Sequence, residues 1–249
     1  MAMKDVSNTH LKNMYLVVDT ETLGMKAGKE YNQKVFDIGY QIIDKHKNVY
    51  SEGSFLVKEF WDRITELKGK GMFYEKYDLY LERIQEGHTK IMDWDSIIEI
   101  ISHEMACYDV DYFSAFNLAF DKRVIEKTSI MLSRKDFDLY ENVEMFDIYH
   151  VACQLLLNRP SYKFLAKLHN KLTEKGNYQT GVESTYAYLK GQFDFKEEHT
   201  GLEDVKLESE ILTYCLRQKK PFDHSINSQS WRLLKKEKPT LSTQLELAL

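Results

Sequence analysis

The order of apolar and polar positions along the chain predicts five β-strands. The first is a continuous apolar run that stops at an acid, which is typical of a buried strand. Only a short polar connection separates the second strand from the third, so we expect these two to form an antiparallel hairpin. The predicted strands are residues 14–19, 35–43, 49–57, 112–116 and 143–146.

Apolar positions three to four residues apart predict helices between and after these strands. The clearest pattern covers 93–108, with Asp93 or Asp95 as the N-cap. Aromatic residues recur at the same spacing in 72–84, which favours a core-facing helix over a base-stacking platform. The other helices are expected to start at Asn117 and to span 148–157, 162–172, 185–190 and 200–216.

A helix before the fourth strand implies a crossover connection, so this strand should lie parallel to the first. The order of elements predicts an α/β fold with a mixed five-stranded sheet flanked by helices. We assign residues 14–218 to one domain, preceded by a polar leader (1–13) and followed by a tail (219–249).

Composition is typical of a soluble globular protein, with 43% hydrophobic and 29% charged residues. No apolar run is long enough to span a membrane, and we find no signal peptide. Cys107, Cys153 and Cys215 lack zinc or disulfide spacing, which suggests a reducing cytoplasm. A net charge of −5 provides no global basic field, although a local basic groove can coexist with an acidic metal site. We therefore expect a cytoplasmic protein with no membrane partner.

The end of the first strand carries two acids, Asp19 and Glu21. Side chains alternate along a strand, so both carboxylates should point to the same side. Two carboxylates at the end of a buried strand repel each other unless something neutralises them, and a hard divalent cation would do so. The competing interpretation is a solvated strand end that carries two charges.

Two further predicted helices supply acids and a histidine. Asp121 lies in the first turn of the helix after the fourth strand, where the helix N-terminus alone would favour an acid. Thr200 and Glu203 have the form of a capping box, so the last helix should start at Thr200. His199 then lies just outside that helix and Asp204 at the end of its first turn, which lets both face one site.

Four acids and one histidine suit a two-metal site for phosphodiester hydrolysis, in which two cations clamp the attacking and leaving oxygens. In this hypothesis Asp19 bridges both ions, and Asp121 supports the second. Glu21 and Asp204 complete the site of the first ion. His199 titrates near neutrality and takes the proton from the attacking water.

Three motifs resemble, in order and context, those of the DEDDh, or DnaQ-like, family of 3′–5′ exonucleases. They are Asp-Thr-Glu-Thr at 19–22, Asn-Leu-Ala-Phe-Asp at 117–121, and His199 followed by four residues and Asp204. The family includes the proofreading epsilon subunit of bacterial DNA polymerase III and ribonuclease T. The resemblance covers about residues 12 to 218, and the ordered set is far more specific than any single motif.

This resemblance implies a ribonuclease H-like fold, two Mg²⁺ or Mn²⁺ ions per site, and stepwise release of nucleoside 5′-monophosphates from a 3′ end. It implies that the backbone of Thr22 and the side chain of Leu23 meet the terminal nucleotide. Asn117 and Phe120 are the other substrate-binding residues that we expect. DNA, single-stranded or with a frayed 3′ end, is the favoured substrate and RNA is the alternative. A catalytically weak protein that binds nucleic acid or a polymerase is the competing hypothesis.

The sequence departs from the family pattern in four places. Phe116 stands where many relatives have histidine, and Gly201 replaces a common alanine. The stretches 60–92 and 174–198 look long, which leaves the substrate preference open.

The tail has the composition of a tether with a small docking element. Its last six residues, 244–249, resemble the motif that binds the bacterial sliding clamp, a glutamine followed by spaced leucines. A short amphipathic end packed on its own domain or on a neighbour is the alternative. The residues expected to contact a clamp are Gln244, Leu245, Leu247 and Leu249.

Overall fold

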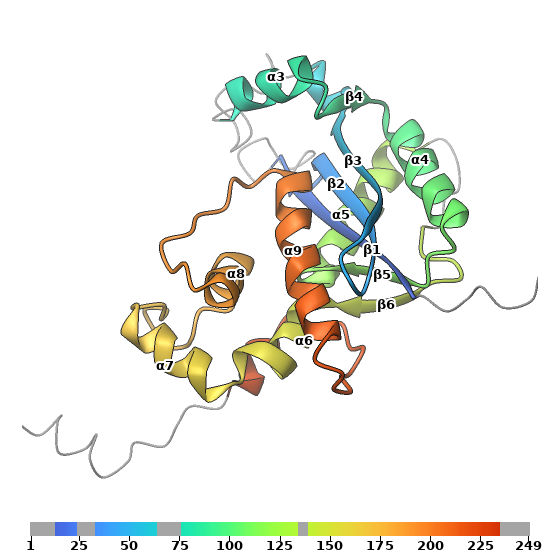
Figure 1. Cartoon of the computed structure of the whole chain (residues 1–249). Helices are drawn as coiled ribbons and strands as arrows, with labels where there is room; N and C mark the ends of the chain where they lie inside the picture. Colours follow the sequence, from blue (N-terminus) through green and yellow to red (C-terminus); the bar gives the residue numbers. More distant parts are fainter. Residues whose placement is uncertain (1–12, 24–32, 64–75, 134–138, 235–249) are drawn as a thin grey trace, which may run out of the picture.

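The computed structural model describes residues 13–23, 33–63, 76–133 and 139–234. A six-stranded sheet lies at its centre, in the order β4-β3-β2-β1-β5-β6 (Figure 1). No helix of the described part of the chain is long and apolar enough to cross a membrane. The strands are β1 (Met14–Thr22), β2 (Val35–Asp44), β3 (Val49–Val57), β4 (Lys90–Met92), β5 (Tyr112–Ala115) and β6 (Glu144–Asp147).

The sheet is mixed, as predicted, but it has one strand more than the sequence suggested. β1, β2 and β3 form the expected antiparallel meander, and β5 lies parallel to β1 as the crossover predicted. The unpredicted strand is β4, which pairs parallel with the edge of β3. It has only three residues, too few for a recognisable alternation. β1 also runs on to Thr22, so Glu21 lies within the strand together with Asp19.

Helices cover both faces of the sheet. α4 (Trp94–Cys107) and α5 (Leu118–Leu132) pack on one face, against the side chains of Leu16 and Val18. α6 (Ile148–Ala152) and α9 (Gly201–Leu216) pack on the other face, against Tyr15 and Val17. Figure 1 shows α9 crossing in front of the strands with α5 behind them. Alternate residues of one strand therefore belong to two separate apolar clusters.

The remaining helices surround these two layers. The predicted 148–157 helix is α6 followed by a π-helical turn, Cys153–Leu157. Asp93 caps α4 as expected, because its side chain accepts a hydrogen bond from Ser96 N. Residues 72–75 of the predicted aromatic helix lie outside the described residues, but Tyr80 of α3 is buried in the core as expected. The others are α1 (Lys58–Trp61), α3 (Tyr77–Gln85), α7 (Pro160–Leu168), α8 (Val182–Lys190) and a 3₁₀ turn (Ser230–Leu233).

Part of the predicted tail packs against α6. The side chain of Ser230 bonds His150 at 2.6 Å, and Trp231 N donates to the Tyr149 hydroxyl at 3.0 Å. The tether hypothesis therefore concerns residues 235–249. These residues, including the clamp-like peptide 244–249, lie outside the described part of the chain, so clamp binding stays a prediction.

Two glycines let the start of α9 lie directly on β2. A Cβ on Gly39 would lie 2.2 Å from backbone atoms of Gly201 and Leu202. A Cβ on Gly201 would lie 2.5 Å from Gly39 N. These separations are far below van der Waals contact, so any side chain at either position would push the helix away from the sheet. This close approach gives a structural reason for a glycine at position 201.

We expect Gly39→Ala to lower the free energy of unfolding by about 3 kcal/mol or more, since an added methyl group must displace backbone atoms. Chemical denaturation followed by circular dichroism would measure the loss. Gly181→Ala is the matched control, because a Cβ there meets nothing within 4 Å. Equal stability of the two variants would contradict the proposed role of the close approach.

Candidate metal centre and active site

The acids of β1 lie on the face of the sheet that α9 covers. Asp19 and Glu21 alternate with the buried Thr20 and are themselves half-buried. Burial, followed by repulsion from Glu208 and Asp121, raises the pKa of Asp19 well above its usual value. Burial also raises the pKa of Glu21 to about 7, although Lys76 opposes this shift. Ionisation of the carboxyl groups at the end of β1 is therefore energetically unfavourable.

Thr20 links these acids to α5. Its backbone N and its Oγ1 donate to Asp121 Oδ1 at 3.1 Å and 2.7 Å. Asp121 lies in the first turn of α5 and is 2% exposed. Burial outweighs these hydrogen bonds and raises the pKa of Asp121 to about 7. The second residue of the Asp-Thr-Glu-Thr motif thus fixes the position of the third predicted acid.

The start of α9 brings in Asp204, but the predicted capping box does not form. Thr200 is the N-cap, yet its side chain caps nothing. Instead, Asp37 Oδ2 of β2 accepts from Gly201 N at 2.9 Å and from the Tyr80 hydroxyl at 3.0 Å. A carboxylate distant in sequence therefore caps this helix, which a local motif cannot reveal.

Asp204 is buried in the first turn of α9, and its Oδ1 accepts no hydrogen bond from the described residues. Burial and repulsion from Glu197 and Glu21 raise the pKa of Asp204 to about 8. Its other oxygen, Oδ2, lies 4.0 Å from His199 Nδ1.

His199 precedes α9 in a left-handed backbone conformation, with a φ of 57°. Such a conformation is unfavourable for a residue with a side chain and often marks a functional site. His199 Nδ1 lies 3.3 Å from Glu197 Oε2. Burial and the charge of Lys76 lower the pKa of His199, which favours a neutral ring that can accept a proton.

Three of the five predicted residues form one compact group. Glu21, His199 and Asp204 each offer a ligand atom, and these atoms lie within 4.8 Å of one another. Asp19 and Asp121 are outside that group. Repulsion from neighbouring acids nevertheless contributes to the raised pKa of each. The structure thus assembles the residues from β1, α5 and α9, with His199 as a potential ligand as well as a potential base.

Two further positioning residues near these acids were not predicted from the sequence. Glu208 lies one helical turn after Asp204, is 1% exposed, and accepts from Phe116 N at 3.0 Å. Asp147 at the end of β6 accepts from Asn117 N at 2.8 Å. The i, i+4 spacing from Asp204 is the signal that would have found Glu208. No local pattern identifies Asp147.

The predicted substrate residues have different surroundings. Thr22 is half-buried, whereas Leu23 is fully buried in the core and offers no surface to a nucleotide in this structure. Asn117 has a left-handed backbone and lines a pocket of about 390 Å³ with Phe116 and Tyr149. Its side chain makes no cap for α5, contrary to the prediction.

Phe120, the fourth predicted substrate residue, is partly buried against the core. The guanidinium of Arg123 lies 5.4 Å from the centre of its ring.

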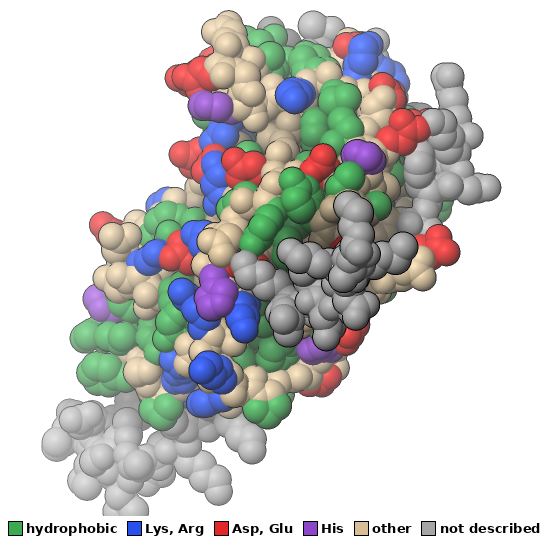
Figure 2. Space-filling model, turned by 45° about the vertical axis from the view of Figure 1, so that its right-hand side comes forward, with side chains coloured by type: hydrophobic (Ala, Val, Ile, Leu, Met, Phe, Trp, Pro, Cys, Tyr) green, Lys and Arg blue, Asp and Glu red, His purple; other side chains and the backbone are tan. Residues whose placement is uncertain are grey.

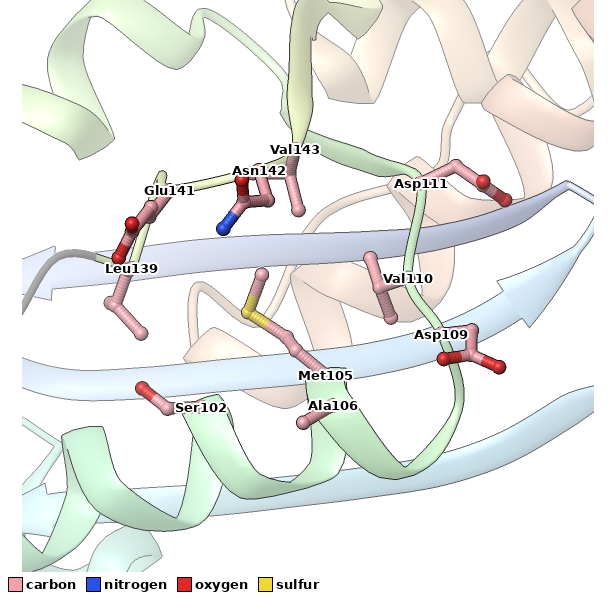
Figure 3. Close-up of a pocket in the computed structure, with 10 residues that line it drawn as sticks. All are labelled: Ser102, Met105, Ala106, Asp109, Val110, Asp111, Leu139, Glu141, Asn142 and Val143. Carbon is pink, nitrogen blue, oxygen red and sulfur yellow. The ribbon is translucent and has the colours of Figure 1, made fainter.

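A separate pocket of about 400 Å³ lies at the opposite end of the strands, near the start of β1. Figure 3 shows Met105, Val110 and Val143 pointing into the space between α4 and the segment before β6. Its lining residue Asp111 accepts from Met14 N at the start of β1, the end of the strand remote from Asp19. This pocket therefore contains none of the acids described above.

Comparisons with known proteins agree on the fold. No family model and no curated protein matches the chain. The solved structure of cell-death related nuclease 4 (CRN-4) is similar, with a TM-score of 0.51 and 12% sequence identity over 83% of this chain. The match covers 64% of CRN-4, so the chain spans less than two thirds of that protein. The chain has a ribonuclease H-like fold.

S. pombe Pop2p in its Mg²⁺- and Mn²⁺-bound form is also similar, with a TM-score of 0.43 and 16% identity over 87% of each chain. At such identities the likeness concerns the fold alone. The likeness to CRN-4 confirms the expected ribonuclease H-like fold, and membership of the DEDDh family stays a prediction.

We expect the protein in chelator to lose thermal stability as the pH rises from about 5 to 8. Glu21, Asp121 and Asp204 have pKa values of about 7, 7 and 8 in the folded state. Unfolded carboxyl groups have values near 4, so the folded state binds more protons in this window and its stability falls with pH. The lowered pKa of His199 has the opposite effect on stability, but it is one group against three carboxyl groups.

Differential scanning calorimetry in buffers of constant ionic strength would measure this loss. Asp204→Asn is the matched variant and should show a flatter dependence, because it removes one of the shifted groups. A melting temperature that is constant or rises from pH 5 to 8 would contradict the assignment.

Proposed function

We propose that the protein is a divalent-metal-dependent 3′–5′ exonuclease of the DEDDh type, which releases nucleoside 5′-monophosphates. The observation that carries this proposal is the convergence of Asp19, Glu21, Asp121, Asp204 and His199 at one end of β1 in a ribonuclease H-like fold. Similarity to a protein named as a nuclease supports it. The 3′–5′ direction and the DEDDh type in this proposal come from the resemblance of the ordered sequence motifs to that family.

The residues present fit a divalent cation. Asp204 Oδ1 is buried without a hydrogen-bond partner among the described residues, and Glu21 and His199 offer ligand atoms beside it. Carboxylate oxygens suit Mg²⁺ or Mn²⁺, and the positive charge would relieve the repulsion that raises these pKa values. In our proposal Asp19, Glu21, Asp121 and Asp204 would hold two such ions.

Bound cations would stabilise the charge that develops on the phosphate oxygens and help to ionise the attacking water. The protein contributes position and proton transfer. Thr20 holds Asp121, and Asp37 holds the start of α9 and with it Asp204. Burial lowers the pKa of His199, which favours a neutral ring that accepts the proton of the water.

Nucleic-acid binding in this proposal depends on local contacts. Figure 2 shows acidic and basic side chains interspersed over the face in view, with no uniform basic field. In this proposal the pocket beside Asn117, with the rings of Phe116 and Tyr149, offers a place for a base. DNA is the favoured substrate, RNA is the alternative, and the backbone of Thr22 completes the contacts with the terminal nucleotide.

The first test is Mn²⁺-dependent cleavage of 3′-labelled and 5′-labelled single-stranded DNA and RNA. Wild-type protein should shorten one of them stepwise from the 3′ end, and Asp19→Asn should abolish cleavage because it removes the shared ligand. The variant should keep its fold, checked by circular dichroism. Near wild-type turnover by Asp19→Asn would refute the two-metal assignment, and binding without cleavage by the wild type would favour the catalytically weak module.

The second test separates the two possible roles of His199. If it is the general base, His199→Ala should reduce turnover by roughly 10²-fold or more. Its Mn²⁺ affinity, measured by calorimetry, should change little. A large loss of Mn²⁺ affinity, with activity restored at high Mn²⁺, would instead make His199 a metal ligand, as its place beside Glu21 and Asp204 allows.

A further inference from the structure

A basic side chain from a distant part of the chain enters the acid cluster. Lys76 directly precedes α3, and its side chain is only 19% exposed. Its Nζ lies 3.6 Å from Glu21 Oε1 and donates a hydrogen bond to the backbone carbonyl of His199. Lys76 therefore contacts two of the three residues in the compact group.

Other residues of α3 also hold this helix in place. Arg83, two turns further along α3, reaches the same region, with its guanidinium 2.7 Å from Glu198 and 3.4 Å from Glu203. Tyr80 of the same helix donates to Asp37. These three contacts hold α3 in place. We therefore explain the position of Lys76 inside the acid cluster by the charge of its side chain.

We propose that Lys76 is a built-in cation that competes with a divalent metal ion for Glu21. The inference rests on the metal site of the proposed function. An ammonium and a divalent ion at one carboxylate repel each other, so the two cations exclude each other there. Lysine is suited to such an exchange, because its compact charge sits on a flexible four-carbon stem that can swing aside. Lys76 neutralises Glu21 until an ion binds, and then leaves it.

Calorimetric titration with Mn²⁺ tests this exchange. Lys76→Met should bind Mn²⁺ roughly tenfold more tightly than the wild type, because a positive charge within a few ångströms has been removed. Lys76→Arg keeps the charge and should resemble the wild type. Lys47→Met is the matched control: it breaks a 3.0 Å ion pair with Glu210, a residue outside the compact group, and should leave the affinity unchanged.

A labelling experiment on the wild-type protein tests the same exchange without any substitution. Released from Glu21, Lys76 should become more reactive toward an amine acylating reagent. Peptide mass spectrometry should therefore show faster acetylation of Lys76 in Mn²⁺ than in chelator, relative to Lys47. This measurement decides the question if Lys76→Met does not fold.

Unchanged or weaker Mn²⁺ binding by a folded Lys76→Met would overturn the inference, as would unchanged or slower acetylation of Lys76 in Mn²⁺. A purely structural role predicts those results. In either case a wild type that binds Mn²⁺ and cleaves nucleic acid leaves the proposed function standing. A wild type that binds no Mn²⁺ by calorimetry would overturn both proposals together.

Discussion

The close approach of Gly201 to Gly39 is the constraint on which the geometry of the site depends. With no side chain on either residue, the first turn of α9 lies directly on β2. Asp37, two residues before Gly39, accepts a hydrogen bond from Gly201 N and so fixes the helix end. The N-terminus of α9, the positive end of its dipole, is thereby brought to the strand next to the acids of β1.

This arrangement also explains how His199 and Asp204 share one site. Five residues apart in a continuous helix, they would point in different directions. Because the helix starts between them, and because His199 has a left-handed backbone, the imidazole turns back toward the first turn of α9. The strain of that conformation is thus part of what assembles the compact group of Glu21, His199 and Asp204.

Burial of carboxylates at the end of β1 opposes folding, and several features offset it. Two apolar clusters, one on each face of the sheet, supply the stabilisation that this end of the strand lacks. Thr20, with two hydrogen bonds to Asp121, and Lys76, next to Glu21, partly compensate the charge. In our proposal divalent cations complete the compensation, so that the same repulsion that weakens the fold makes the site bind metal.

The sequence alone predicted most of the strands and helices and the candidate acids, because both depend on local patterns. Apolar periodicity identified β1, β2, β3, β5 and the helices that flank them, since each element must turn an apolar face to the core. The alternation along β1 put Asp19 and Glu21 on one side, and the crossover connection made β5 parallel to β1. β4 was missed because three residues at a sheet edge carry no periodic signal.

Only the tertiary structure decided which side chains support those acids. Thr200 and Glu203 have the local form of a capping box, yet Asp37 from β2 caps the helix, and Glu203 contacts Arg83 and Lys206 instead. Asp147 and Lys76 reach the site from distant segments, and no spacing along the chain encodes such encounters. The physical reason is that burial, the close approach of two backbones and the field of neighbouring charges exist only once the sheet and its helices have packed together.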